Sequence, residues 1–121
     1  MGAKKYPLRI AKRKLAVNTT EETIESDRVP SGELWCLQYH SFENETATRG
    51  EARGYIESIG EDLPLWAQLV PTMDNLYWTD SLVFLRESER LSVHQKSCAA
   101  NDVLRLRGHG YRVVGFTGEE I

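Results

Sequence analysis

Turn-forming residues divide this sequence into short segments, and this punctuation limits the possible folds more than any other feature. The segment Val29-Pro30-Ser31-Gly32 is typical, because proline fixes φ at the second turn position and glycine is favoured at the fourth. Turn signals recur roughly every ten residues, and the runs between them alternate apolar and polar side chains. About seven or eight such runs predict an all-β protein, a single antiparallel β-sandwich of jelly-roll type.

The alternation within residues 33–43 predicts a strand and which of its side chains share a face. Trp35, Leu37 and Tyr39 are expected on one face of this strand, because successive side chains point to opposite sides. The opposite face is then expected to carry Leu34, Cys36, Gln38, His40 and Phe42. Aromatic residues occur on both faces, which suits a strand with one face in a core.

Proline and glycine predict local features in two other segments. Pro64 lies in an apolar run and has no backbone N–H, which indicates an edge strand or the start of a strand, with a short helical turn as the alternative. Gly108-His109-Gly110 separates two alternating stretches near the C-terminus, and this interruption predicts a bulge.

Length and composition indicate one soluble domain. The chain has 121 residues, of which 40% are hydrophobic and 27% are charged. No apolar run approaches the ~18 residues of a membrane helix, and the first residues lack the apolar core of a signal peptide. We therefore expect no membrane span, no export and two reduced cysteines. A disulfide between Cys36 and Cys98 stays open, because neighbouring strands could bring them within bonding distance.

Positive charge is concentrated at the N-terminus. The first 18 residues contain six basic side chains and no acidic one, whereas the remaining nine basic residues face all 18 acidic ones. We expect residues 1–20 to form an extended arm that docks on a negative surface, and residues 21–121 to form the sandwich domain. A frayed, solvated terminus is an equally open alternative. The candidate partner-binding residues of the arm are Lys4, Lys5, Arg9, Lys12, Arg13 and Lys14.

Both cysteines and two of the three histidines occur in a mirrored pair of motifs, Cys36-x3-His40 and His94-x3-Cys98. This spacing places two metal ligands on one face of a helix. In a strand, which rises ~3.3 Å per residue, the two ligands of each motif would lie ~13 Å apart. Because both segments alternate like strands, the sequence predicts no metal site.

Motifs of hydrolytic enzymes are missing from the sequence. Neither G-x-S-x-G nor H-E-x-x-H occurs. A Ser92, His94 and Asp102 combination can be drawn on paper, but most chains of this composition allow one. Gly108-x-Gly110 is not followed by a predicted helix, so it is not a phosphate loop. We expect a protein that is not an enzyme and that uses no cofactor.

Two kinds of binding surface remain. Nucleic-acid binding would depend on the arm together with Arg105, Arg107 and Arg112, but the rest of the chain is net acidic and the arm has one aromatic residue. Glycan binding has more support, because the chain is rich in large aromatic residues that stack on ligands, although such residues also fill thin cores. The candidate exposed aromatic residues are Trp66, Tyr77 and Trp78.

Two stretches of the sequence resemble small virion proteins of tailed bacteriophages. V-P-S-G-E-L-W at residues 29–35 is similar to the turn that enters the second strand in that group. A-A-N-D-V-L-R-L-R-G-H-G-Y-R-V-V at residues 99–114 is similar to the closing segment of the sandwich. Asn101-Asp102 occupies the usual Gly-Asp place and Tyr111 the usual tyrosine place.

This resemblance implies a β-sandwich attached to a virion, commonly as a head decoration or stabilising protein and sometimes in the neck, tail or fibre. Its partner would be the major capsid protein or another virion component. By analogy it would act as a homo-oligomer, such as a trimer, assembled in the host cytoplasm. The alternative is a glycan- or receptor-binding module of a phage tail, neck or fibre. The group supplies no catalytic residues.

Overall fold

The computed structural model describes residues 4–17, 20–46, 51–69, 77–96 and 98–115. The strands formed by these residues are β1 (Lys4–Leu15), β2 (Glu21–Glu25), β3 (Glu33–Asn44), β4 (Glu51–Ser58), β5 (Glu61–Leu69), β6 (Tyr77–Thr79), β7 (Val83–Leu85), β8 (Arg90–Lys96) and β9 (Val103–Val114). Every pairing between them is antiparallel. In these ranges no helix is long and apolar enough to cross a membrane. The predicted all-β class is confirmed.

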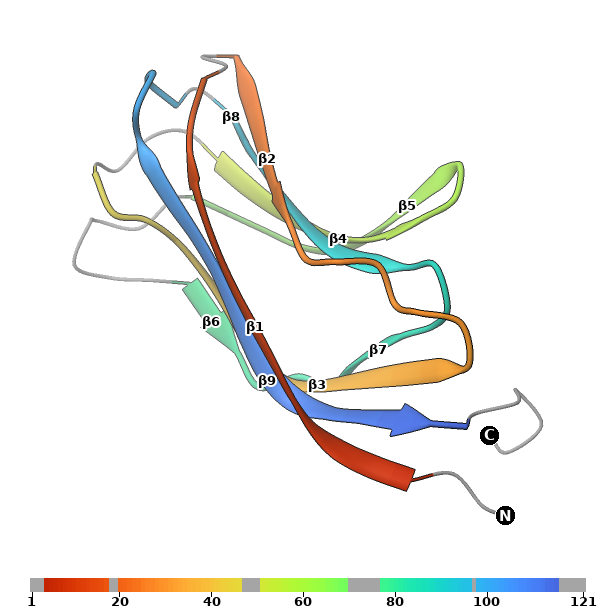
Figure 1. Cartoon of the computed structure of the whole chain (residues 1–121). Helices are drawn as coiled ribbons and strands as arrows, with labels where there is room; N and C mark the ends of the chain where they lie inside the picture. Colours follow the sequence, from red (N-terminus) through yellow and green to blue (C-terminus); the bar gives the residue numbers. More distant parts are fainter. Residues whose placement is uncertain (1–3, 18–19, 47–50, 70–76, 97, 116–121) are drawn as a thin grey trace.

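The strands form two sheets. Sheet A has the order β1-β9-β3-β6, with β7 paired to another part of β3, and sheet B has the order β2-β8-β4-β5. Figure 1 shows two layers, with β1, β9 and β3 curving along one and β2, β8 and β4 along the other. The face of each sheet that is turned toward the other sheet is its inner face, and the opposite face is its outer face.

Side chains from the inner faces of both sheets form one hydrophobic core. Sheet A contributes Leu8 and Ile10 from β1, and sheet B contributes Leu91 and Val93 from β8. Burying a side chain of this size stabilises the fold by about 1.5–3 kcal/mol relative to leaving it exposed. The other buried members of the core are Ile24, Val29, Trp35, Leu37, Phe42, Ala52, Val83, Leu85, Leu104 and Leu106. The two layers therefore pack in a sandwich-like manner.

Most residues of the expected N-terminal arm are part of sheet A. Strand β1 pairs with β9 over its whole length, from Lys4 opposite Val114 to Leu15 opposite Val103. The burial of Leu8 and Ile10 explains why apolar residues are interleaved with charges in this segment. As an edge strand, β1 also gains from its lysines and arginines, which oppose edge-to-edge association. Residues 4–15 thus form a strand rather than a detached arm.

The prediction from proline is confirmed in sheet B. Strand β5 contains Pro64 and lies at the end of the strand order, where a missing backbone donor is tolerated. The register between β4 and β5 shifts between Gly54 and Tyr55. Trp66 packs over Gly54 and against the hydrophobic core, and a Cβ atom on Gly54 would overlap the indole ring.

The predicted faces of β3 are wrong beyond Leu37. The register between β3 and β9 shifts between Leu37 and Tyr39, so that Gln38 is an extra residue in the strand. Trp35 and Leu37 share the inner face before this bulge, so the predicted alternation holds up to Leu37. After it, Phe42 is buried in the core and Tyr39 lies on the outer face. One extra residue reverses the alternation, because side chains repeat with a period of two.

The bulge lies in β3, opposite the glycine pair of β9. Strand β9 continues through Gly108 and Gly110 without a break in its register with β1. Gly110 lies opposite Leu37, and a Cβ atom on it would overlap the carbonyl oxygen of Cys36. The two glycines of β9 therefore do mark a bulge. The bulge lies in the neighbouring strand β3, however, and not in β9 itself.

Buried polar groups occupy the end of the sandwich where β1 leads into β2. Glu22 is 2% exposed, and its carboxylate accepts a hydrogen bond from the Val17 N–H at 2.8 Å and pairs with Lys14 Nζ at 2.7 Å. At the same end, the Asn44 amide donates to Gln95 at 3.2 Å and to Asp102 at 3.0 Å. Ion pairing makes the burial of the Glu22 carboxylate tolerable.

Replacing Lys14 with methionine should lower the free energy of unfolding by about 2 kcal/mol, because the buried carboxylate of Glu22 then loses its cation. Urea unfolding at neutral pH measures this change. Lys12→Met is a matched control on the same strand, since the Lys12 partner Asp27 is largely exposed and such pairs contribute about 0–1 kcal/mol. Equal effects of the two substitutions would contradict the structural role of the Lys14–Glu22 pair.

Candidate ligand-binding surface

Three aromatic side chains from neighbouring strands form a stack on the outer face of sheet A. The Tyr39 ring of β3 stacks on the His109 ring of β9, with centroids 5.1 Å apart and planes inclined by 14°. It also stacks on Trp78 of β6, at 6.2 Å and 23°. The strand order places Tyr39 between the other two rings. The aromatic stack therefore ends in two exposed rings, His109 and Trp78, the latter 57% exposed.

A shallow depression of about 600 Å³ lies at the His109 end of the aromatic stack. His109 and Tyr39 line it on one side, and Pro7, Arg9 and Ala11 of β1 line it on the other. Arg9 lies directly opposite His109 in the register of β1 and β9. The short side chains of Pro7 and Ala11 leave room beside the imidazole ring.

Basic side chains surround the aromatic stack. Within the described residues, no ion pair joins Arg9 or Arg13 to a carboxylate, whereas Arg107 pairs with Glu43 at 2.8 Å. Arg105 similarly pairs with Glu45. The outer face of sheet A is therefore aromatic and locally positive, in a protein whose formal net charge is −3.

The six predicted arm residues are divided between the two faces of β1. Leu8 and Ile10 mark the inner face, so the alternation places Lys5, Arg9 and Arg13 on the outer face. The ammonium group of Lys5 lies 4.2 Å from the centroid of the Tyr111 ring. The other three residues, Lys4, Lys12 and Lys14, follow the alternation of the inner face.

The three predicted surface aromatic residues have different environments. Trp78 is exposed in the aromatic stack. Trp66 is half-buried between the sheets, where its indole N–H donates to His40 Nε2 at 3.0 Å. Trp66 thus serves the core rather than an exposed platform. The side chain of Tyr77 lies outside the described part of the structure.

The mirrored cysteine and histidine motifs are dispersed in the structure. Cys36 lies next to Tyr111, and the hydrogen bond between their side chains raises the pKa of Tyr111. His40 is in the core, and His94 lies on the outer face of sheet B. Cys98 is buried after the end of β8, and both cysteines are free thiols. Among the described residues, no cluster of three potential ligands could hold a metal ion.

A second polar arrangement, on sheet B, has the outline of a catalytic triad. His94 Nδ1 lies 3.0 Å from a Glu21 carboxylate oxygen, and His94 Nε2 lies 3.1 Å from the Ser92 hydroxyl oxygen. However, Ser92 is 0% exposed, so a substrate could not reach its oxygen. Strand β8 is also paired on both sides, by β2 and β4, so its backbone donors are used within the sheet. This arrangement orients side chains rather than performing acyl transfer.

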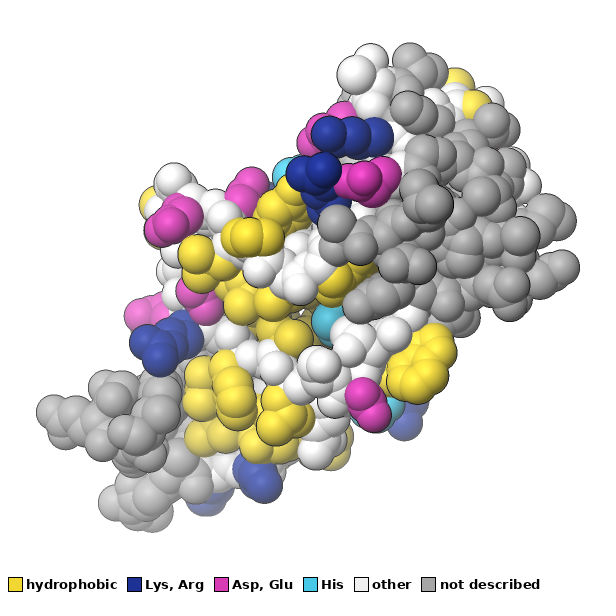
Figure 2. Space-filling model, turned by 180° about the vertical axis from the view of Figure 1, so that it is seen from behind, with side chains coloured by type: hydrophobic (Ala, Val, Ile, Leu, Met, Phe, Trp, Pro, Cys, Tyr) yellow, Lys and Arg dark blue, Asp and Glu magenta, His cyan; other side chains and the backbone are white. Residues whose placement is uncertain are grey.

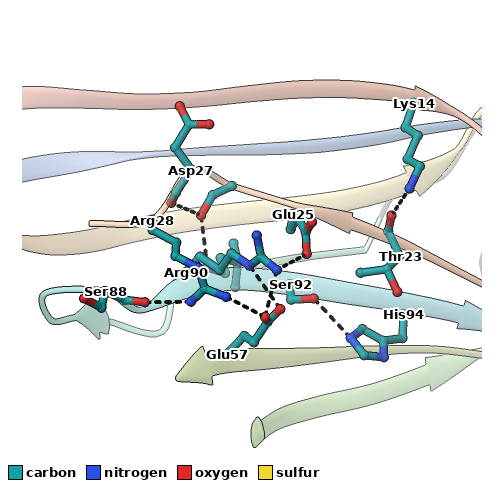
Figure 3. Close-up of polar contacts among 12 residues, drawn as sticks. Lys14, Thr23, Glu25, Asp27, Arg28, Glu57, Ser88, Arg90, Ser92 and His94 are labelled. Carbon is teal, nitrogen blue, oxygen red and sulfur yellow. Dashed lines mark hydrogen bonds and ion pairs between the residues drawn. The ribbon is translucent and has the colours of Figure 1, made fainter. Parts of the chain in front are cut away.

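An ion-pair network covers the neighbouring part of sheet B (Figure 3). Arg90 pairs with Glu25 at 2.9 Å and with Glu57 at 2.8 Å, and Arg28 also pairs with Glu57 at 2.9 Å. The hydrogen bond from Arg90 is the main reason that the pKa of Glu57 is lowered. Arg28 donates a further hydrogen bond to the Ser88 carbonyl. These charges satisfy one another, unlike Arg9 and Arg13 on sheet A.

Other large hydrophobic side chains are exposed on the described part of the protein besides those of the aromatic stack. Leu82 and Phe84 are exposed near β7, and Ile59 and Leu63 are exposed in the hairpin between β4 and β5. Figure 2 shows hydrophobic side chains gathered across the middle of the back face, with charged side chains around them. These residues enlarge the apolar surface available for protein contacts.

Comparisons with family models, with curated proteins and with solved structures found no match. The candidate surface is therefore defined by its own geometry. Sequence reasoning identified Trp78, Arg9 and Arg13, but it missed Tyr39 and His109. Tyr39 was expected on the same face of the strand as Trp35 and Leu37, because the bulge in β3 was not foreseen. The position of His109 between two glycines could have marked it as an exposed side chain. Gly108-His109-Gly110 was instead interpreted only as a bulge in the strand.

Proposed function

We propose that this protein is a non-enzymatic virion protein of a tailed bacteriophage that binds its partner through the outer face of sheet A. The observation that carries this proposal is the aromatic stack, which lies beside Arg9 and shares the outer face of sheet A with Arg13. Exposed aromatic rings anchor interfaces, and cations without a partner favour an acidic surface. The V-P-S-G-E-L-W turn leads into β3, and the second similar stretch includes β9, so the resemblance concerns the two strands that carry Tyr39 and His109.

We further propose that the two-sheet fold is a jelly roll. The short strands β6 and β7 pair with different parts of β3, so together they occupy one position in sheet A. Counted in this way, the two sheets have four positions each, in the orders β1-β9-β3-β6 and β2-β8-β4-β5, which supports this proposal. The jelly roll is an eight-stranded double sheet that occurs in viral capsid proteins and in lectins. Both kinds of protein act through surfaces, which agrees with the functions considered for this chain.

The partner in this proposal is the major capsid protein or another virion component, and the protein acts as a homo-oligomer. A shell presents many copies of the same binding site, so contacts that are weak singly add through multivalency. An acidic shell surface would complement Lys5, Arg9 and Arg13. A trimer is the form expected by analogy, since closed symmetric assemblies are common.

Reversing the charge of Lys5, Arg9 and Arg13 to glutamate should leave the fold intact and reduce occupancy on particles at least about tenfold. These side chains lie on the outer face, so their replacement does not disturb the core. Co-sedimentation with purified particles that lack the protein measures occupancy, and far-ultraviolet circular dichroism checks folding.

The double variant Arg53→Glu and Lys96→Glu is the control, because both side chains are exposed on the outer face of sheet B. It should bind particles like the unmodified protein. Full occupancy of the triple variant would overturn the docking role of this face. Deletion of residues 2–14 is a poorer test, because it removes most of β1 from sheet A.

A second candidate function is glycan or receptor binding by a phage tail, neck or fibre protein. The specific observation in its favour is the solvent exposure of both terminal rings of the aromatic stack. Aromatic faces of this kind accept flat apolar surfaces of a ligand, while nearby polar groups fix its orientation. Saturable binding on a glycan array would distinguish this function from a purely structural one.

A further inference from the structure

We infer that the His109 end of the aromatic stack binds a carboxylated sugar ring of an acidic polysaccharide, and that Arg9 recognises the carboxylate. This inference rests on the glycan-binding function proposed above and assigns its ligand class and its site. The depression between His109 and β1 is the place where the ring binds.

The shape of the site favours one ring at the end of the stack. Tyr39 lies between Trp78 and His109, so the His109 ring is the last member on the side of β1. Pro7 and Ala11 are too short to fill the space beside the imidazole. The apolar C–H face of a sugar ring can therefore continue the stack against His109.

The charge beside this position favours an acidic ring. Arg9 is opposite His109 in the register, so its guanidinium can meet a carboxylate on a ring stacked there. Arg107 also lines the depression, but it is paired with Glu43 at 2.8 Å. Arg9 has no such partner among the described residues, so an acidic ligand does not have to displace a carboxylate of the protein.

The spacing of the outer-face cations favours a polysaccharide over a nucleic acid. Lys5, Arg9 and Arg13 recur every fourth residue of β1, which corresponds to ~13 Å in a strand. Each strand of duplex DNA carries a charge about every 3.4 Å, a much denser array. A polysaccharide with a carboxylate on only some of its rings matches the wider spacing. The negative net charge of the protein also opposes a dense polyanion.

Titration calorimetry with a hyaluronan octasaccharide tests the inference, because this oligomer alternates acidic and neutral rings. We expect saturable binding to the full-length protein that Arg9→Gln and His109→Ala each weaken about tenfold. Arg53→Gln is the matched control, an exposed arginine on the outer face of sheet B, and it should bind like the unmodified protein. The same octasaccharide with reduced carboxyl groups should bind about tenfold more weakly as well.

Other results would overturn the inference in distinguishable ways. If the carboxyl-reduced octasaccharide binds equally well, the site recognises neutral sugar, and the glycan-binding function survives without its acidic ligand. Tighter binding of oligothymidylate than of hyaluronan would assign the face to nucleic acid. If the octasaccharide does not bind and a glycan array is also blank, the glycan-binding function fails together with the inference.

Discussion

Replacing Gly110 with alanine should lower the free energy of unfolding by about 3 kcal/mol or more. Gly110 lies opposite the bulge in β3, and an added Cβ atom would overlap the backbone carbonyl of Cys36. A flexible side chain could turn away from a new methyl group, but a carbonyl in the middle of a sheet moves only if the strands separate. Urea unfolding followed by circular dichroism measures the loss.

Gly108→Ala is the matched control for this prediction. Gly108 lies two residues away on β9, where a Cβ atom would be 3.2 Å from the Tyr39 carbonyl and 3.5 Å from its next neighbours. This contact is tight but can relax, so the expected cost is about 1 kcal/mol. If Gly110→Ala were no more harmful than Gly108→Ala, the close approach of β9 to the bulge would be wrong.

Lowering the pH from about 7.5 to about 5 should destabilise the protein by about 2 kcal/mol through His40. This side chain is 1% exposed, and burial lowers its pKa from 6.5 to about 4. In the unfolded chain it takes up a proton near pH 6.5, whereas in the folded protein it stays neutral until about pH 4. The unfolded state binds more protons between these values, so stability is full above pH 6.5 and falls as the pH decreases through this range.

Burial is the cause of the lowered pKa of His40, and the contact with Trp66 opposes protonation in the same direction. The indole N–H can only donate, so His40 Nε2 must accept and the imidazole proton lies on Nδ1. That nitrogen has no hydrogen-bond partner among the described residues. A second proton on Nε2 would place two donors face to face and would charge a buried ring.

Urea unfolding between about pH 7.5 and about pH 5 measures this effect, in a range where Glu57, with its lowered pKa, keeps its charge. The substitution His40→Met should flatten the dependence on pH. His109→Gln, which removes an exposed histidine, should leave the slope unchanged. An undiminished slope in His40→Met would show that a different group is responsible.

Much of the secondary structure could be predicted because alternation records local burial. Residues 33–43 were expected as a strand and correspond to β3, the segment that contains His94 was expected as a strand and belongs to β8, and Pro64 correctly indicated an edge strand. The N-terminal segment shows the limit of the same reasoning. Its concentrated positive charge suggested an arm, because nothing local reveals that β9 is available to pair with β1.

The aromatic stack could be predicted only in part. Trp78 was identified from the sequence as a candidate exposed aromatic residue. Tyr39 was assigned to the face of Trp35 and Leu37, because a strict period of two was expected along the whole strand. The bulge that reverses this face depends on the close approach of Gly110 from a strand about seventy residues away, which is a property of the pairing.

The sequence by itself determined the all-β class, most strand positions and the residue types that could bind a ligand, because turn chemistry and burial act over a few neighbouring residues. Only the tertiary structure decided that the basic N-terminal segment is a strand of the sandwich, that His40 faces inward and Tyr39 outward, and that Arg9 lies beside His109. These relations depend on strand order and register, which join residues far apart in the chain. A one-residue change of register reverses every side chain beyond it.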